Sequence, residues 1–269
     1  MAAHWLRHSR PLIWSALALL MGGVLISRYA ADTAPAATDT ITVGTNVGYP
    51  PFIFVNDAGT VTGFDIAVME AIATRLGKKL IIKDMAFDVL LLALRHGIVD
   101  IIIGGISLTK SRKETGLLIP YYTDHAEALG CFYRAEKPYT DTSLATAAAQ
   151  HLTVCTQAGS VYEDVLQAYP GIVIKTVPDM SDVTLEVAYG AADLGVLCID
   201  ATHALLQIQP LFAGHELCVP DEHAGHGLGL GIAPQNTQLK QAITQALAAL
   251  QADGTLDRLA AQWLSKEPV

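Results

Sequence analysis

The sequence predicts an α/β fold built as two lobes, each a mainly parallel sheet flanked by helices. From Asp39 onward, short β-branched runs alternate with longer segments of helical periodicity. The run Val99–Ile103 is apolar apart from Asp100, as is typical of a strand buried on both faces of a parallel sheet. A second series of the same kind follows the Ala- and Thr-rich stretch 142–150. The alternation of strands and helices is therefore repeated, although the amino-acid sequence is not.

The first lobe opens on a β-branched run and a turn-forming Pro50-Pro51 pair. Its first helix starts at Asp65, carries apolar residues at helical spacing and stops at Gly77, which are ordinary start and stop signals. The predicted elements are, in order, strand, helix, strand, helix and strand: 41–45, 65–76, 80–83, 88–96 and 99–103.

The second lobe and the tail follow the same reasoning. The second lobe is predicted as strand, helix, strand, helix and strand: 152–156, 162–168, 172–177, 182–189 and 194–199. The tail is predicted as one strand and two helices that pack on the first lobe: 229–233, 237–252 and 255–264. We expect three segments, the first and last forming lobe 1 and the middle one lobe 2, with crossings near 130–134 and 226–232: 40–129, 130–227 and 228–269.

Residues 1–31 are predicted to be a secretory signal peptide or an uncleaved N-terminal anchor, followed by a linker over 32–39. Arg7 and Arg10 precede an apolar run over 12–26, which has the length of a secretory core and is short for a membrane span. With a signal peptide or with an anchor, the folded part of the protein is exported from the cytoplasm. We therefore expect a periplasmic protein that touches the membrane only through this segment, if it is uncleaved.

Composition excludes some functions. With 269 residues and 51% hydrophobic content, the chain has ample material for buried cores. Its formal net charge of -9 disfavours binding to nucleic acid and to anionic lipid.

Metal binding is not expected either. The four cysteines, Cys131, Cys155, Cys198 and Cys218, lack zinc-type spacing. Disulfides can form after export, but burial of Cys155 and Cys198 as small apolar strand residues is the preferred interpretation. The His-rich segment 215–226 is interpreted as a solvated loop, because its spacing fits no rigid pair of ligands. We expect neither a metal nor a cofactor.

The binding residues are expected in the loops that follow the strands, because ligands of open α/β sheets bind beyond the carboxyl ends of the strands. After the apolar strand of the first lobe, glycines at 104 and 105 allow close approach to the main chain. Ser107 offers a hydroxyl, and Arg112 offers a guanidinium that matches a carboxylate. The alternative is an ordinary turn with Thr109 as N-cap and Arg112 solvated.

The second lobe supplies complementary groups. Gln157 to Val161 lie between a strand and a helix, so free N–H groups and the Ser160 hydroxyl can face a ligand. Asp200 follows an apolar strand, where it can receive an ammonium group. As alternatives, Ser160 or Asp200 is an ordinary helix N-cap. Together with Arg112, these groups complement a zwitterion.

The chain resembles the periplasmic solute-binding proteins of polar amino-acid ABC importers, family 3, in the glutamine-, histidine- and lysine/arginine/ornithine-binding group. The resemblance extends over nearly all of residues 40 to 266. It rests on an ordered set of segments, GTNVGYPPF, GFDI, AFD, GISLTKSR, QAGS, one acid and the C-terminal helix: 44–52, 63–66, 86–88, 105–112, 157–160, Asp200 and 254–264. It implies a type II periplasmic-binding-protein fold with two crossover strands as hinge, and delivery of an amino-acid-like ligand to an ABC importer permease.

The resemblance also implies roles for individual residues. Arg112, Ser107 and the Gly105 main chain would hold the ligand carboxylate from the first lobe. Ser160 and the Val161 amide would contact it from the second lobe. Asp200 would bind the ligand ammonium group. The rings of Tyr49 and Phe87 would contact the ligand from both sides.

Two positions depart from the relatives that this group contains. Asn46 stands where binders of cationic amino acids, and the glutamine binder, generally have Asp. Because an amide cannot neutralise a cationic side chain, a neutral or polar ligand is expected in preference to a cationic one. Gln157 replaces the Lys of the glutamine binder, so glutamine specificity does not transfer directly.

An enzyme is the main alternative. The segment 199–207 and residues 216–218 resemble the corresponding region of cyclohexadienyl (prephenate/arogenate) dehydratases, which share this fold. That family has a catalytic acid where this chain has His203, and a neutral imidazole is a poor substitute. We therefore expect no catalytic residues. A membrane-anchored sensory module is the third alternative.

Overall fold

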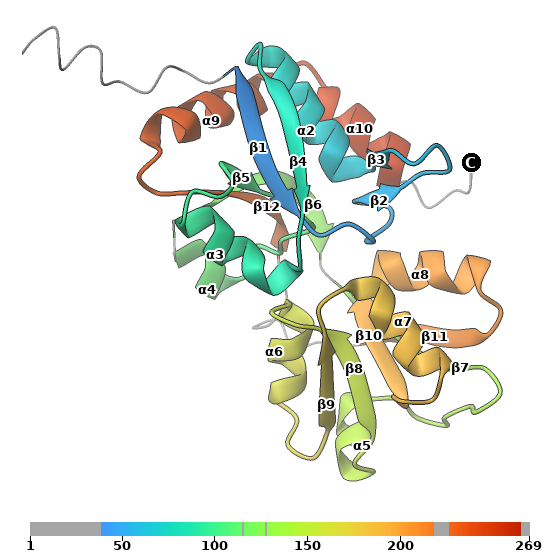
Figure 1. The fold of residues 1–269 in the computed structure, drawn as a ribbon. Helices are drawn as coiled ribbons and strands as arrows, with labels where there is room; N and C mark the ends of the chain where they lie inside the picture. The colour runs from blue at the N-terminus through green and yellow to red at the C-terminus, as the bar shows by residue number, and fades with distance from the viewer. Residues whose placement is uncertain (1–38, 115, 127, 218–225, 265–269) are drawn as a thin grey trace, which may run out of the picture. The chain divides into compact units, whose positions relative to one another are not determined.

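Two five-stranded sheets organise the residues that the computed structural model describes (Figure 1). These residues are 39–114, 116–126, 128–217 and 226–264. The predicted signal peptide or anchor over 1–31, and the linker apart from its last residue, lie outside this part of the chain.

The first sheet has the strand order β4-β1-β5-β12-β6. The central strand β1 runs parallel to β4 and β5, whereas β12 is antiparallel to both β5 and β6. The strands are β1 (Thr40–Thr45), β4 (Lys79–Asp84), β5 (Ile101–Ile102), β6 (Leu118–Ala126) and β12 (His226–Ile232). The helices of this lobe are α2 (Phe64–Arg75), the 3-10 turn η1 (Phe87–Val89), α3 (Leu90–Arg95), α4 (Lys110–Glu114), α9 (Thr237–Ala252) and α10 (Thr255–Leu264). A two-stranded sheet joins β2 (Phe54–Val55) to β3 (Val61–Thr62).

The second sheet has the order β11-β7-β10-β8-β9. Its strands β8, β9 and β10 are parallel, and β7 is antiparallel to β10 and β11. The strands are β7 (Leu129–Arg134), β8 (Thr153–Gln157), β9 (Val173–Val177), β10 (Leu194–Cys198) and β11 (Phe212–Leu217). The helices are α5 (Leu144–Ala149), α6 (Val161–Gln167), α7 (Met180–Ala188) and α8 (Ile199–Ile208).

The chain passes from the first sheet to the second between β6 and β7, and returns between β11 and β12. The predicted two-lobed α/β architecture is therefore confirmed. Below, the first lobe means the described residues that carry the first sheet, and the second lobe means residues 129–217. The strands β7 and β12, expected at the crossings, are each paired within one sheet.

The last helices pack on the first lobe, where α9 and α10 both contact α2. Their apolar faces bury Ile243, Leu247 and Leu256, and the Trp263 ring lies edge-on to Phe54 at 6.1 Å between centroids. Burial of this apolar surface attaches the tail to the first sheet and leaves the opposite ends of its strands for the loops that carry the site.

The cysteines of the described part lie in the second sheet, where Cys131, Cys155 and Cys198 are buried. Burial raises the pKa of the Cys131 and Cys155 thiols to about 12, so neither is a reactive thiolate. The interpretation of Cys155 and Cys198 as buried strand residues is confirmed. Cys218 lies outside the described residues.

Gly195 in β10 is required for packing. A Cβ at this position would lie 2.2 Å from Cζ of Phe132, whose buried ring is held against Phe212 at 5.4 Å between centroids. We expect Gly195→Ala to lower the free energy of unfolding by about 1–3 kcal/mol through overpacking, measured by urea titration. Gly44→Ala, whose Cβ would meet Val99 methyl carbons at 3.2 Å, should cost less; an equal loss would contradict the packing argument.

Candidate functional site

A cavity at the carboxyl ends of the parallel strands receives residues from both lobes. The loops that line it follow β1, β4 and β5 in the first lobe, and β8 and β9 in the second. It contains about 240 Å³ of empty space, part of it open to solvent, which is slightly below the usual range of small-molecule pockets. The lining residues are Tyr49, Phe87, Gly104, Gly105, Ser107, Arg112, Gln157, Ser160, Val161, Tyr162 and Met180.

Eight of the ten residues predicted to bind a ligand line this cavity: Tyr49, Phe87, Gly105, Ser107, Arg112, Gln157, Ser160 and Val161. The other two do not. Asn46 is buried behind Gln157, with its Oδ1 2.7 Å from Nε2 of that residue. Asp200 lies in the first turn of α8, partly exposed, and is absent from the described lining.

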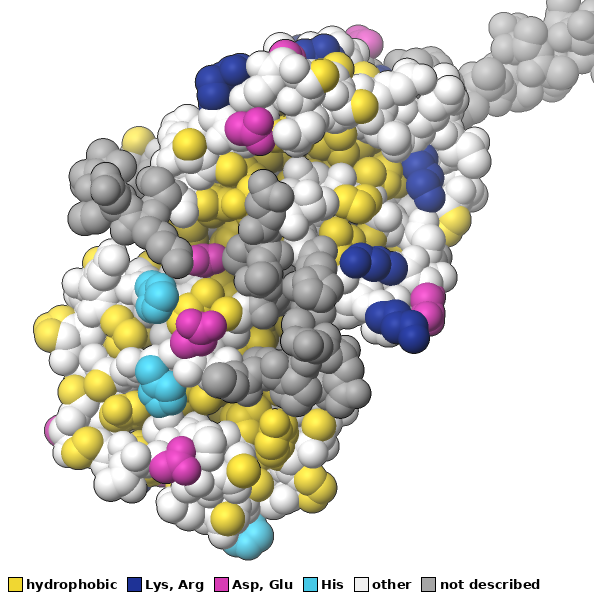
Figure 2. All heavy atoms as spheres, turned by 180° about the vertical axis from the view of Figure 1, so that it is seen from behind, with side chains coloured by type: hydrophobic (Ala, Val, Ile, Leu, Met, Phe, Trp, Pro, Cys, Tyr) yellow, Lys and Arg dark blue, Asp and Glu magenta, His cyan; other side chains and the backbone are white. Residues whose placement is uncertain are grey.

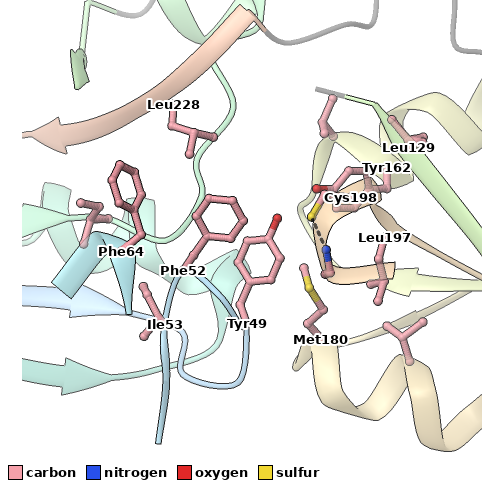
Figure 3. Packing of buried hydrophobic residues seen from close by; sticks show 14 of the residues in the cluster. Tyr49, Phe52, Ile53, Phe64, Leu129, Tyr162, Met180, Leu197, Cys198 and Leu228 are labelled. Atoms are coloured by element: carbon pink, nitrogen blue, oxygen red, sulfur yellow. Dashed lines mark hydrogen bonds between the residues drawn. The ribbon is translucent and has the colours of Figure 1, made fainter. Parts of the chain in front are cut away.

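Asp200 is also not the N-cap of α8, so this alternative is wrong. The helix begins one residue earlier, at Ile199, and the Sγ of Cys198 accepts the Ala201 N–H at 3.3 Å (Figure 3). Asp200 therefore occupies the first turn, where a carboxylate interacts favourably with the helix dipole.

The Gly104-Gly105 loop is held by a buried carboxylate. Oδ2 of Asp65 accepts the Gly105 N–H at 2.8 Å, and its Oδ1 accepts the Tyr121 hydroxyl at 2.6 Å. The Asp65 side chain is fully buried, and this burial raises its pKa to about 7 although both hydrogen bonds act in the opposite direction. The Gly105 N–H is thus occupied, which leaves the Gly105 carbonyl for a ligand.

Gly105 also fits closely against an aromatic ring. Its φ is +59°, and a Cβ there would lie 2.4 Å from Cε1 of Tyr49. The Tyr49 ring packs on Phe52 at 4.9 Å between centroids and lies on the side of the first lobe that faces Met180 and Tyr162 of the second (Figure 3). A side chain at position 105 would therefore displace one wall of the cavity.

Arg112 lies on the short helix α4 and connects the two lobes. Its guanidinium donates to the Ser107 carbonyl at 3.4 Å and to the Gly159 carbonyl at 3.1 Å. Its main-chain N–H donates to Oγ1 of Thr109 at 3.3 Å. Thr109 therefore caps the turn, as the alternative interpretation expected, and Arg112 lines the cavity in the same arrangement.

Ser160 is the N-cap of α6. Its Oγ donates to the Gln157 carbonyl at 2.6 Å and accepts the Glu163 N–H at 3.3 Å, while Glu163 accepts the Gly159 N–H at 2.8 Å. The single hydroxyl proton of Ser160 is thus already used. The N–H at the first helical position, that of Val161, has no partner within a helix and lies at the cavity.

The binding of an anion in this cavity depends on nearby charged and N–H groups and not on the net charge of the protein. On the face that Figure 2 shows, Lys and Arg side chains gather on the first lobe. The second lobe has three Lys or Arg residues against ten Asp and Glu. Among the described residues that line the cavity, Arg112 alone is charged. An anion bound here would therefore depend on one guanidinium and neighbouring N–H donors.

No group of three or more His, Cys, Asp or Glu residues that could hold a metal occurs within the described ranges. His215 is exposed on β11, with its Nε2 2.6 Å from Oγ1 of Thr142. The other members of the His-rich segment lie outside these ranges, apart from Glu216, Leu217 and the backbone of His226. Within the same part of the chain, no helix is long and apolar enough to cross a membrane.

Sequence reasoning missed two lining residues, Tyr162 and Met180, whereas Gly104 was expected to allow close approach to the main chain. Tyr162 follows the predicted Ser160-Val161 pair within the first turn of α6, so its place beside the N–H groups of the helix start could have indicated it. Met180 begins α7 just after β9, a strand parallel to β8, so its loop lies at the same edge of the sheet as Gln157.

Comparisons with known proteins give a consistent result. A probable ABC transporter arginine-binding protein, ArtJ, of Chlamydia trachomatis serovar D is 28% identical over 254 residues, covering 94% of this chain and 97% of that protein. The structure of an ancestral arginine-binding protein bound to arginine matches with a TM-score of 0.75 at 26% identity, over 86% of this chain and 100% of that one.

A further solved structure supports the fold alone. It is an ancestral amino acid-binding protein described as a precursor of cyclohexadienyl dehydratase, with a TM-score of 0.73 at 24% identity, over 84% of this chain and 96% of that one. The family model described as bacterial extracellular solute-binding proteins, family 3, matches residues 41–266. The chain therefore belongs to the bacterial extracellular solute-binding proteins, family 3.

Proposed function

We propose that this solute-binding protein captures an amino acid with an uncharged side chain and delivers it to an ABC importer. The cavity carries this proposal, because it combines Arg112 from the first lobe with the Val161 N–H from the second. A ligand that contacts both lobes stabilises their closed arrangement, which is what an importer can sense. The Chlamydia relative is named as a probable arginine-binding protein of an ABC transporter, and the ancestral protein was solved with arginine bound, which supports an amino-acid ligand and an importer partner.

The main-chain and side-chain groups suggest how the ligand lies. Its carboxylate is assigned to the Arg112 guanidinium, the Ser107 hydroxyl and the Val161 N–H. Its ammonium is assigned to the Gly105 carbonyl, because the N–H of that residue is held by Asp65 and because Asp200 lies outside the described lining. The aliphatic part packs against the rings of Tyr49 and Phe87.

An uncharged side chain is favoured over a cationic one. The described lining contains no carboxylate, so a guanidinium or ammonium group of the ligand would have no counter-charge in direct contact. In this respect the proposed ligand differs from arginine, which the named relatives bind.

The dehydratase alternative has no support at the cavity. His203, at the position of the catalytic acid in that family, is exposed on α8 and lies outside the described lining. No catalytic role is proposed. The family is extracellular, which supports a periplasmic location, and the proposed contact with the membrane is limited to the N-terminal segment if it is uncleaved.

Thermal shift provides the first test. The purified full chain is screened against the twenty L-amino acids and prephenate. We expect at least one neutral or polar amino acid to raise the melting temperature, because a ligand that binds only the folded state stabilises it through linkage. Turnover of prephenate, or the absence of a shift with every amino acid, would reject the proposal.

A further inference from the structure

A chain of hydrogen bonds leads from a carboxylate of the second lobe to the cavity. Oδ1 of Asp179 accepts the Asn46 amide at 2.7 Å. Oδ1 of Asn46 in turn accepts the Gln157 amide at 2.7 Å. Asn46 follows β1 in the first lobe, whereas in the second lobe Asp179 follows β9 and Gln157 is the last residue of β8. This series of hydrogen bonds therefore crosses between the lobes twice, next to the proposed binding site.

The orientation of both amides follows from their partners. Nδ2 of Asn46 faces Asp179 and the Met85 carbonyl, and Nε2 of Gln157 faces the Pro178 carbonyl at 3.1 Å. An ionised carboxylate and a carbonyl only accept hydrogen bonds, so the nitrogen atoms must point toward them. Both N–H groups of Asn46 are thereby used, which removes it from direct contact with a ligand.

Gln157 presents its oxygen to the cavity. Its Nε2 donates to Asn46 and Pro178, whereas its Oε1 accepts no hydrogen bond from the described residues. Gln157 is 2% exposed and lines the cavity, so Oε1 is the polar atom that it can offer to a ligand. Each bond in such a chain polarises the next, so the Asp179 charge strengthens Oε1 as an acceptor.

The Asp179 side chain does not cap the helix that it precedes. It is the N-cap of α7, where an Asp side chain commonly accepts an N–H of the first turn, yet its carboxylate makes no capping bond. The main-chain carbonyl of Asp179 accepts the Asp182 N–H instead, at 3.1 Å. The carboxylate is thus directed to Asn46, although capping would be the local alternative.

We propose that Asp179 is a positioning residue that determines specificity: through Asn46 it fixes Gln157 so that the cavity presents an uncharged acceptor to the ligand side chain. This rests on the proposed function of the cavity. The chemical class that fits is a side chain that donates a hydrogen bond without carrying a charge, such as a carboxamide. A side-chain carboxylate, which only accepts, is disfavoured there.

The test compares L-glutamine with L-glutamate by titration calorimetry. The wild-type full chain should bind L-glutamine at least about tenfold more tightly. Asp179→Asn removes the charge and introduces a group that donates as well as accepts, so it should narrow this ratio about tenfold. Asp182→Asn makes the same change of charge one turn further along α7 and should leave the ratio unchanged. An unchanged ratio in Asp179→Asn, or equal changes in both variants, would overturn the proposal.

A second readout does not need a ligand. In nuclear magnetic resonance spectra of the ligand-free protein, the side-chain amide signals of Asn46 and Gln157 should shift in Asp179→Asn and stay in place in Asp182→Asn. A Gln157 signal that does not respond would reject the positioning role. If the wild type binds no amino acid at all, the proposed function fails, and the amide signals still decide the role of Asp179.

Discussion

Arg112→Ala is expected to abolish detectable binding of the amino acid identified by thermal shift, with at least a roughly 100-fold rise in Kd. A bidentate bond between a guanidinium and a carboxylate contributes about 1.5–3 kcal/mol for each hydrogen bond to a charged group. Arg112 alone carries a charge among the lining residues that the structure describes, so the others in this set offer no substitute. Titration calorimetry measures the loss directly.

Two variants separate recognition from structure. Arg112→Lys keeps the charge but loses the planar pair of donors, so it should bind more weakly than the wild type and better than Arg112→Ala. Lys110→Ala removes an exposed cation from the same helix and should not change the affinity. Because Arg112 also donates to the Gly159 carbonyl, urea unfolding of Arg112→Ala must show a folded protein. Unchanged affinity in that folded variant would contradict the carboxylate site.

Local signals predicted the elements whose ends are defined by neighbouring residues. The helices 237–252 and 255–264 were predicted with the observed bounds, because the Asn236 side chain caps the first and Gly254 separates the two. The helix predicted over 88–96 is divided into the 3-10 turn η1 and α3. The strand predicted over 99–103 is paired only at Ile101–Ile102.

Other elements gave weaker signals. The strands β6 and β11 were not predicted as strands, because their polar residues interrupt the apolar alternation. The helix α5 lies in the Ala- and Thr-rich stretch 142–150, for which no element was predicted. Its local signal is Ser143, which accepts the Thr146 N–H as an N-cap.

The candidate site divides in the same way. Arg112, Ser107 and the loop at Gln157 could be predicted, because each follows a recognisable strand in a short segment. The pairs that support these residues could not. Asp65 reaches Gly105 across 40 positions, and Asn46 reaches Asp179 across 133. No local pattern encodes contacts of this kind, since they depend on how the sheets bring their loops together.

The second large effect is expected in the free energy of unfolding of the wild type, which should depend on pH through Asp65. Asp65→Asn should remove this dependence. Burial raises the pKa of Asp65 from 3.8 to about 7 in the folded protein, so between these values the folded state holds a proton that the unfolded chain has released. Stability then falls as pH rises through this window and levels off above it. One pKa unit corresponds to about 1.4 kcal/mol, which gives an upper limit of about 4 kcal/mol for the loss.

The asparagine side chain of this variant cannot titrate, so the variant should gain stability relative to the wild type as pH rises from about 4.5 to about 8. Urea unfolding at several pH values measures this difference, in which the titration of all other groups cancels. Asp57→Asn removes an exposed carboxylate from the loop between β2 and β3 and serves as the control. Two parallel curves for wild type and Asp65→Asn would show that the carboxylate ionises normally. A difference that grows with pH would show that ionising the buried Asp65 carboxylate costs stability, although its oxygens position the Gly105 loop at the binding cavity.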